Sequence, residues 1–107
     1  MQNKTYPGRD SGMAKTKKRE DLFIPCHVDK GLFSNELSVE FELYETPFSM
    51  FAPKDSVVLK GELPGEGLLR VSVVEKKKGL NLIELPAETI QQGRRFMRVY
   101  PDVLVSG

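Results

Sequence analysis

The sequence is poor in the residues that build disulfide scaffolds, metal centres and membrane spans. Its 107 residues include one cysteine, one histidine and no tryptophan. One cysteine cannot form an intramolecular disulfide, and a zinc site would need more ligands than one histidine supplies. No apolar run approaches the roughly 18 residues of a membrane helix, and no N-terminal run resembles the core of a signal peptide. We therefore expect a soluble, cytoplasmic protein with no metal, no cofactor and no membrane partner.

Excess charge of one sign is also missing, but the charges are unevenly distributed. Sixteen Lys and Arg against fifteen Asp and Glu give a formal net charge of +1. Residues 1–20 hold six bases and two acids, a balance of +4, whereas residues 21–107 hold ten bases and thirteen acids, a balance of −3. The first segment has so few apolar residues that burial could not offset the entropy of ordering it. We predict a disordered basic arm over residues 1–20 and a single β-barrel domain over residues 21–107.

From residue 21 onward, apolar and polar residues alternate with the period of two that half-buried strands show. The strands predicted from this alternation, most of them ended by Gly or Pro, are Leu22–Val28, Leu37–Tyr44, Val57–Leu63, Leu68–Glu75, Leu80–Leu85 and Arg94–Tyr100, with Val103–Val105 as a further candidate. Residues 86–93 indicate one helical turn that ends at Gly93. About six short strands without a helix of ten residues predict an all-β fold. We expect a small antiparallel barrel, SH3-like or related.

The apolar positions of these strands are enough for one core. The predicted core consists of Leu22, Ile24, Val28, Leu37, Val39, Phe41, Leu43, Val57, Leu59, Leu69, Val71, Val73, Leu85, Met97 and Val99. Cys26 lies in line with Ile24 and Val28, which predicts a buried, inert thiol.

No combination of residues predicts catalysis. Neighbouring residues of a strand point to opposite faces, so Cys26 and His27 cannot act together as nucleophile and base. Glu40 and Glu42 share one strand face, but alternating glutamates on a wet face are what solubility alone requires. The sequence contains none of the motifs of serine hydrolases, zinc proteases or P-loop enzymes. We predict a binding or interaction module that is not an enzyme.

The segment Arg94–Tyr100 carries the clearest candidate binding surface. In a strand, Arg94, Phe96, Arg98 and Tyr100 share one face, so that bases and aromatic rings alternate along it. Platforms for single-stranded nucleic acid use this alternation, because arginine neutralises phosphate while the aromatic rings stack on bases. Lys76, Lys77 and Lys78, together with the arm, could add a sequence-independent attraction. In the alternative interpretation, Phe96 belongs to the core, the arginines pair with carboxylates, and the lysines form a solvated hairpin tip.

A second candidate surface lies between Pro47 and Pro53. Phe48, Met50 and Phe51 make this segment more apolar than a surface loop needs to be, which indicates either an edge strand or a loop that caps the barrel. With Leu32 and Phe33 it could form an exposed patch for a protein partner or a homodimer contact. In the alternative interpretation, the same residues close the end of the barrel.

Overall fold

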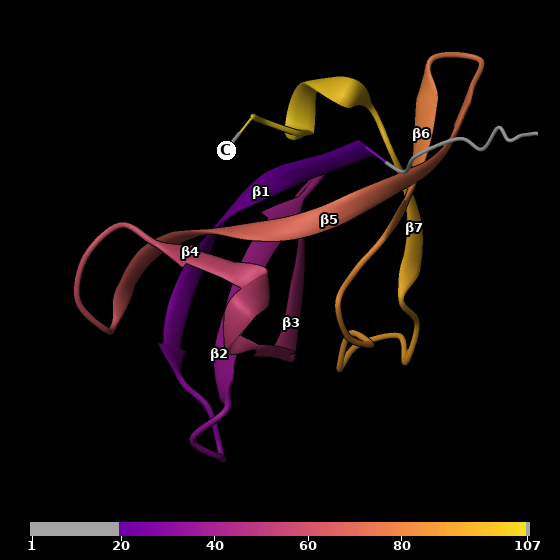
Figure 1. The fold of residues 1–107 in the computed structure, drawn as a ribbon. Coiled ribbons are helices and arrows are strands. Elements are labelled where there is room, and N and C mark those ends of the chain that lie inside the picture. The colour runs from indigo at the N-terminus through magenta and orange to yellow at the C-terminus, as the bar shows by residue number, and fades with distance from the viewer. Residues whose placement is uncertain (1–19, 107) are drawn as a thin grey trace, which may run out of the picture.

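The computed structural model describes residues 20–106, which form a single curled antiparallel sheet (Figure 1). Its strands are β1 (Glu20–Lys30), β2 (Glu36–Leu43), β3 (Thr46–Pro53), β4 (Val57–Leu59), β5 (Gly65–Lys77), β6 (Leu80–Glu84) and β7 (Phe96–Val99). Two 3-10 turns, η1 (Lys54–Ser56) and η2 (Pro101–Val103), complete the elements of this part of the chain. The prediction of an all-β fold resembling a small barrel is confirmed. The described residues contain no helix that could cross a membrane.

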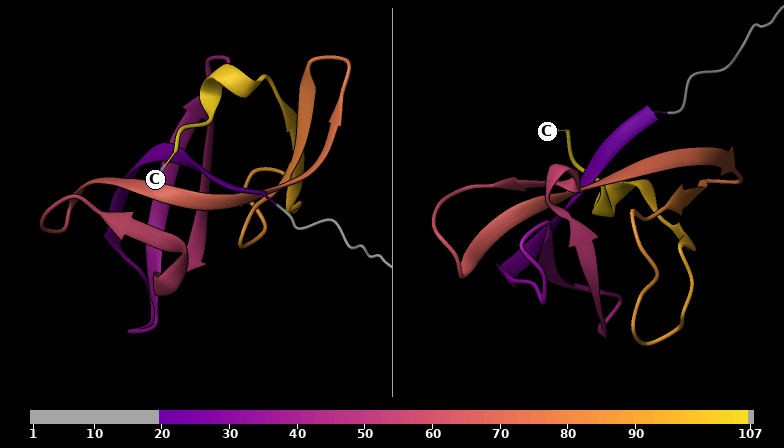
Figure 2. Two further views of the ribbon diagram at one scale, coloured as in Figure 1. Left: turned by 45° about the horizontal axis from the view of Figure 1, so that its top comes forward. Right: turned by 60° about the horizontal axis from the view of Figure 1, so that its bottom comes forward.

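The strands follow the order β3-β2-β1-β5-β6-β7, and β4 pairs with the first part of β5. The two long strands β1 and β5 lie side by side in the middle of this order, with nine paired positions between them. The sheet curls so strongly that it forms a half-barrel, as the two views in Figure 2 show. Strands β3 and β7 end the order and do not pair with each other.

Contacts between loops and strands link the two ends of the sheet. The Ile90 N–H, in the loop between β6 and β7, donates to the carbonyl of Ser49 on β3 at 2.8 Å. The backbone N–H of Tyr100, just after β7, donates to the hydroxyl of Tyr44 in the β2–β3 turn, also at 2.8 Å. The rings of Tyr44 and Tyr100 meet edge to face, with their centroids 5.9 Å apart.

The core fills the concave side of the sheet. The buried apolar residues are Ile24, Cys26, Val28, Leu37, Val39, Phe41, Leu43, Phe48, Met50, Ala52, Leu69, Val71, Val73, Ile83, Leu85 and Val99. Most of the predicted core positions are among them, because the alternation correctly identified the inward face of each strand. Leu59 is a wrong prediction: it is exposed at the end of the short strand β4.

Two hairpins turn on residue pairs in the left-handed region. Tyr44 and Glu45 have φ values of 54° and 65° and connect β2 to β3, while Lys78 and Gly79, at 55° and 79°, connect β5 to β6. Such two-residue turns match the twist of the strands that they join. The turn at Lys78 and Gly79 contains a glycine, which adopts a positive φ without strain, whereas the turn at Tyr44 and Glu45 lacks the usual glycine or asparagine.

Several predicted boundaries are wrong. Strand β4 ends at Leu59 rather than Leu63, and β7 covers only Phe96–Val99 rather than Arg94–Tyr100, because its partner β6 offers only four paired positions. Strand β1 already begins at Glu20, which pairs with Val73 and so belongs to the sheet and not to the predicted arm. The rest of that arm, residues 1–19, lies outside the described residues.

Glycine is required where three strands meet. A Cβ on Gly67 of β5 would lie 2.9 Å from the Val28 Cγ2 of β1 and 2.9 Å from the Val58 carbonyl oxygen of β4. The absence of a side chain therefore lets β4 and β1 approach β5 at the same position. Near β7, the predicted helical turn over residues 86–93 is shorter than expected: residues 86–88 are irregular, and only residues 89–93 form a turn. The Gly93 N–H donates to the Thr89 carbonyl at 2.7 Å, and Gly93 has a φ of 65°.

Candidate functional site: the free edge of strand β7

The backbone of β7 offers hydrogen-bonding groups on the side that faces away from β6. Leu85 and Arg95 continue the register of the two strands, and the Leu85 N–H donates to the Arg95 carbonyl at 2.6 Å. In an antiparallel pair, bonded positions alternate with positions whose N–H and C=O groups point outward. The positions that are hydrogen-bonded to β6 and Leu85 are thus Val99, Met97 and Arg95. The backbone groups of Phe96 and Arg98 point to the unpaired edge.

This free edge is short. Tyr100 is the next residue whose backbone groups point to the unpaired edge, and its N–H is already bonded to the Tyr44 hydroxyl. At the other end, the Arg94 carbonyl accepts a bond from the Thr89 N–H at 2.9 Å. Between these two points, no hydrogen bond from another described residue reaches the outward backbone groups of Phe96 and Arg98. The free edge therefore provides two donors and two acceptors in one line.

The opposite end of the sheet is protected. The two-residue turn fixes the register of β2 and β3, so the outward positions on β3 are Pro47, Ser49, Phe51 and Pro53. The two prolines have no N–H to offer. The Ser49 N–H donates to the Gln91 Oε1 at 2.8 Å, and the Ser49 carbonyl accepts from the β6–β7 loop. Strand β3 thus presents few backbone groups to a partner.

The side chains of the β7 edge surround a shallow hollow. A hollow of about 540 Å³ is lined by Leu82, Glu88 and residues 94–98. Phe96 is 48% exposed and Tyr100 is 55% exposed, while Met97 is half-buried and points toward the core. The structure thus places Phe96 on the open face and not in the core.

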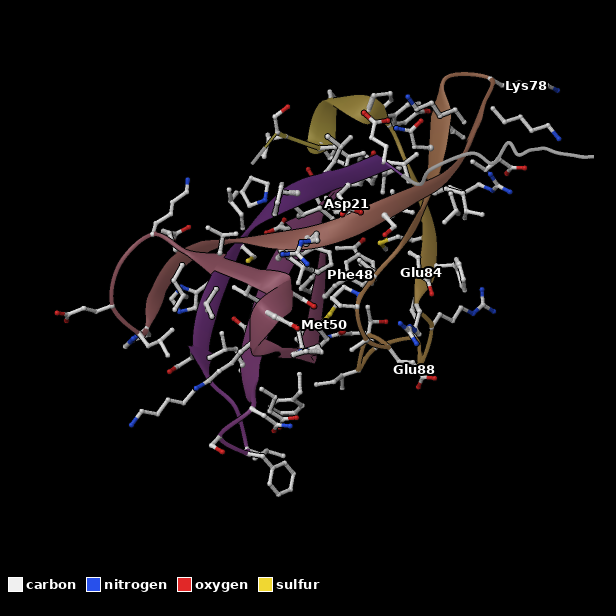
Figure 3. The ribbon with its side chains drawn as sticks, in the orientation of Figure 1. Asp21, Phe48, Met50, Lys78, Glu84 and Glu88 are labelled. Atoms are coloured by element: carbon white, nitrogen blue, oxygen red, sulfur yellow. The ribbon has the colours of Figure 1, made fainter. Side chains whose placement is uncertain are left out.

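Acidic side chains balance the arginines of this surface. Arg98 reaches Glu75 with Nη1 and Oε1 3.3 Å apart, and Arg95 reaches Glu84 with Nη2 and Oε2 3.7 Å apart. Glu88 lines the same hollow, and Figure 3 shows it with Glu84 on the β7 side of the molecule. The two glutamates that share one strand face, Glu40 and Glu42, lie on β2, far from β7 in the strand order. Two of the three arginines of the hollow are therefore paired with carboxylates, a third carboxylate lines the same hollow, and the surface has little excess positive charge.

The three lysines of the β5–β6 hairpin lie apart from the hollow. Lys76 and Lys77 end strand β5, and Lys78 stands at the tip of the hairpin (Figure 3). The Lys76 Nζ lies 3.0 Å from the Glu20 Oε1 of β1. None of the three lines the β7 hollow, so the structure does not join them to the arginine face.

Of the candidate apolar patch, Phe48 and Met50 are not exposed, which agrees with the alternative interpretation that they pack inside the barrel. Phe48 and Met50 are 6% and 1% exposed, because β3 pairs with β2 and turns both side chains into the core. Figure 3 shows them between β3 and the β6–β7 loop, and the Phe48 ring stacks on Phe41 at a centroid distance of 5.6 Å. Phe51 is half-buried on the other face of β3. Of the predicted patch, Leu32 and Phe33 remain exposed, in the β1–β2 turn.

Cys26 and His27 lie on opposite faces of β1, because Cys26 is buried and His27 is exposed. Cys26 is buried. This burial and, to a smaller extent, the nearby charge of Glu66 raise the pKa of its thiol from 9.0 to about 11. His27 lies on the opposite face, with its Nδ1 3.9 Å from the Glu66 Oε2. Residues 20–106 contain no group of three or more His, Cys, Asp or Glu side chains that could hold a metal ion.

Sequence reasoning identified the side chains of this surface but not its backbone. The period of two placed Phe96 and Arg98 on one face, and the structure agrees. That β7 ends the sheet depends on the strand order, for which the sequence offered no local signal. No protein-family model matches this chain, and no curated protein or solved structure is significantly similar to it.

Proposed function

We propose that this protein is a non-enzymatic interaction module that binds an extended polypeptide segment along the free edge of β7. The observation that carries the proposal is the pair of outward backbone positions, Phe96 and Arg98, beside a hollow lined by both apolar and charged side chains. A bound segment would add a strand to the sheet, a mode in which main-chain hydrogen bonds supply affinity and side-chain pockets supply specificity.

The lining of the hollow indicates which segments would bind. Leu82 and Phe96 offer apolar contact, and burying an aliphatic or aromatic side chain against them would strengthen binding. Arg94 has no ion pair with another residue of the described range, whereas Arg95 and Arg98 do. A segment with one apolar residue and one carboxylate placed to meet Arg94 fits this arrangement best.

The experiment separates the backbone from the side chain at position 98. Peptides are selected from a phage-displayed library of random dodecapeptides, and their affinities for wild type, Arg98→Ala and Arg98→Pro are compared. Both variants lose the guanidinium group, but only proline removes the outward N–H. We expect Arg98→Pro to bind the selected peptides about three- to tenfold more weakly than Arg98→Ala, which is the value of one hydrogen bond.

A stability control accompanies the binding measurement. Arg98→Pro should remain folded, because its N–H makes no bond to β6 and proline is tolerated on that side of an edge strand. Met97→Pro should lose about 3 kcal/mol or more, since it removes a bond of the β6–β7 ladder. Equal peptide affinities for the two folded variants of Arg98, or a library that yields no binder, would contradict the proposal.

Binding of single-stranded nucleic acid is the second candidate. The exposure of Phe96 and Tyr100 between arginines supports it, since both rings are accessible for stacking. The carboxylates of Glu75, Glu84 and Glu88 count against it, because they cancel the attraction for phosphate. A gel retardation titration with single-stranded DNA and RNA at two salt concentrations distinguishes the candidates. Nucleic-acid binding should weaken with salt and with Phe96→Ala, which should cost about 1–3 kcal/mol of binding free energy.

A further inference from the structure

We propose that the segment received by the β7 edge is β7 of a second copy of this chain, so that two copies form one continuous sheet across a two-fold axis at Met97. This inference rests on the proposed function and names its partner. It follows from the spacing of the outward backbone groups and from the order of side chains along the strand.

The backbone is suited to pairing with itself. Phe96 and Arg98 are two residues apart and both direct their N–H and C=O groups to the free edge. An antiparallel partner centred on Met97 brings Phe96 opposite Arg98 of the partner subunit, and Arg98 opposite the partner's Phe96. Both pairs are then hydrogen-bonded positions, and all four groups of each edge find a partner. An isologous interface of this kind uses the same surface twice.

The side chains are complementary in the same register. Along the outward face the order is Arg94, Phe96, Arg98, Tyr100. When the partner strand runs antiparallel with its Met97 opposite this Met97, each arginine of this face lies opposite an aromatic ring of the partner. No arginine of this face then lies opposite an arginine. An arginine over an aromatic face is an attractive cation–π contact. On the other face, Met97 meets the partner's Met97, and both are half-buried side chains that would lose their remaining exposure.

Other registers lack this complementarity. Centring the pair on Phe96 places Arg98 opposite Arg94 of the partner subunit, and centring it on Arg98 places two Arg98 side chains together. Like charges directly opposite each other destabilise a strand pair. The register about Met97 is therefore the favoured one among the three centres that the free edge allows.

The edge also limits the strength of the dimer. The Tyr44 hydroxyl already holds the Tyr100 N–H, so the paired segment is confined to the residues around Met97. Few hydrogen bonds and a small buried area imply weak association, detectable at high protein concentration. We expect self-association in sedimentation equilibrium between roughly 10 μM and 1 mM, a range typical of small, transient interfaces.

The test uses variants that exchange the two paired side chains. Phe96→Arg puts arginine opposite arginine and should raise the dimer Kd by about tenfold or more, through loss of two cation–π contacts and gain of two repulsions. The double variant Phe96→Arg/Arg98→Phe restores an arginine opposite an aromatic ring at both positions. Its Kd should return to within a few fold of wild type, with circular dichroism confirming that both variants are folded.

Three results would overturn the self-pairing. They are a wild type that stays monomeric at 1 mM, a dimer whose Kd is unchanged by Phe96→Arg, and a dimer that persists in Arg98→Pro. The last result would place the interface elsewhere, for example at Leu32 and Phe33. A monomeric wild type whose selected peptides still depend on the Arg98 N–H would refute the self-pairing and leave the proposed function intact. A monomeric wild type whose peptide affinity also does not depend on the Arg98 N–H would refute both the self-pairing and the proposed function.

Discussion

Truncating two phenylalanines, Phe96 and Phe48, tests which face of the sheet each occupies. Full burial of a phenylalanine is worth about 1.5–3 kcal/mol, and Phe96 keeps about half of its surface exposed. Phe96→Ala should therefore lower the free energy of unfolding by about 1 kcal/mol. Phe48 is 6% exposed and stacked on Phe41, so Phe48→Ala also leaves a cavity and should cost about 3–5 kcal/mol.

The measurement is a thermal melt followed by circular dichroism, with urea unfolding of each variant. In a domain of this size, 1 kcal/mol corresponds to about 4–8 °C in Tm. Phe96→Ala should thus lower Tm by about that amount, whereas Phe48→Ala should lower it by more than about 12 °C. A loss for Phe96→Ala equal to that of Phe48→Ala would put Phe96 in the core. Both the free edge and the aromatic surface built on it would then be wrong.

Three further predictions concern Cys26 in the core, Gly67 where three strands meet, and the contact through which Tyr44 links the two ends of the sheet. Cys26 should react slowly with a thiol reagent in the native protein. Because folding raises its pKa from 9.0 to about 11, the stability that it contributes is complete below pH 9 and should decline as pH rises toward 11 in urea titrations. Gly67→Ala should cost about 1–3 kcal/mol through overpacking, whereas Gly61→Ala, with open space around it, should stay within about 0.5 kcal/mol. Tyr44→Phe should lose about 0.5–1.5 kcal/mol, because the Tyr100 N–H loses its acceptor; an unchanged urea midpoint would show that water replaces the hydroxyl.

The sequence predicted those features that depend on one strand at a time. Alternation identifies the two faces of a strand whatever its neighbours are, so the inward positions and the exposure of Phe96 and Arg98 could be read directly. The turn at Gly79 was also predictable, since glycine adopts a positive φ without strain.

Features that depend on two strands were missed. The turn at Tyr44 and Glu45 carries no glycine, so the pairing that buries Phe48 and Met50 had no local signal. Pro47 and Pro53 favoured an edge strand or a loop equally well, and only the strand order decides between them. The ion pair between Arg98 and Glu75 likewise links residues that become neighbours only through the packing of β5, β6 and β7.

The difference between the two ends of the sheet sets an upper limit on assembly. A sheet with two edges free to pair can add a copy at each edge and so can grow without limit, as fibrils do. Here Pro47 and Pro53 bring no N–H to the outward edge of β3 and the Ser49 N–H is already bonded, so this edge is less suited than β7 to adding a copy. The pairing of β7 with β7 that we propose would use this edge in both copies and so would end at two copies. Replacing Pro47, Pro53 and Gln91 would expose further hydrogen-bonding groups at the β3 edge and so would favour the addition of more copies.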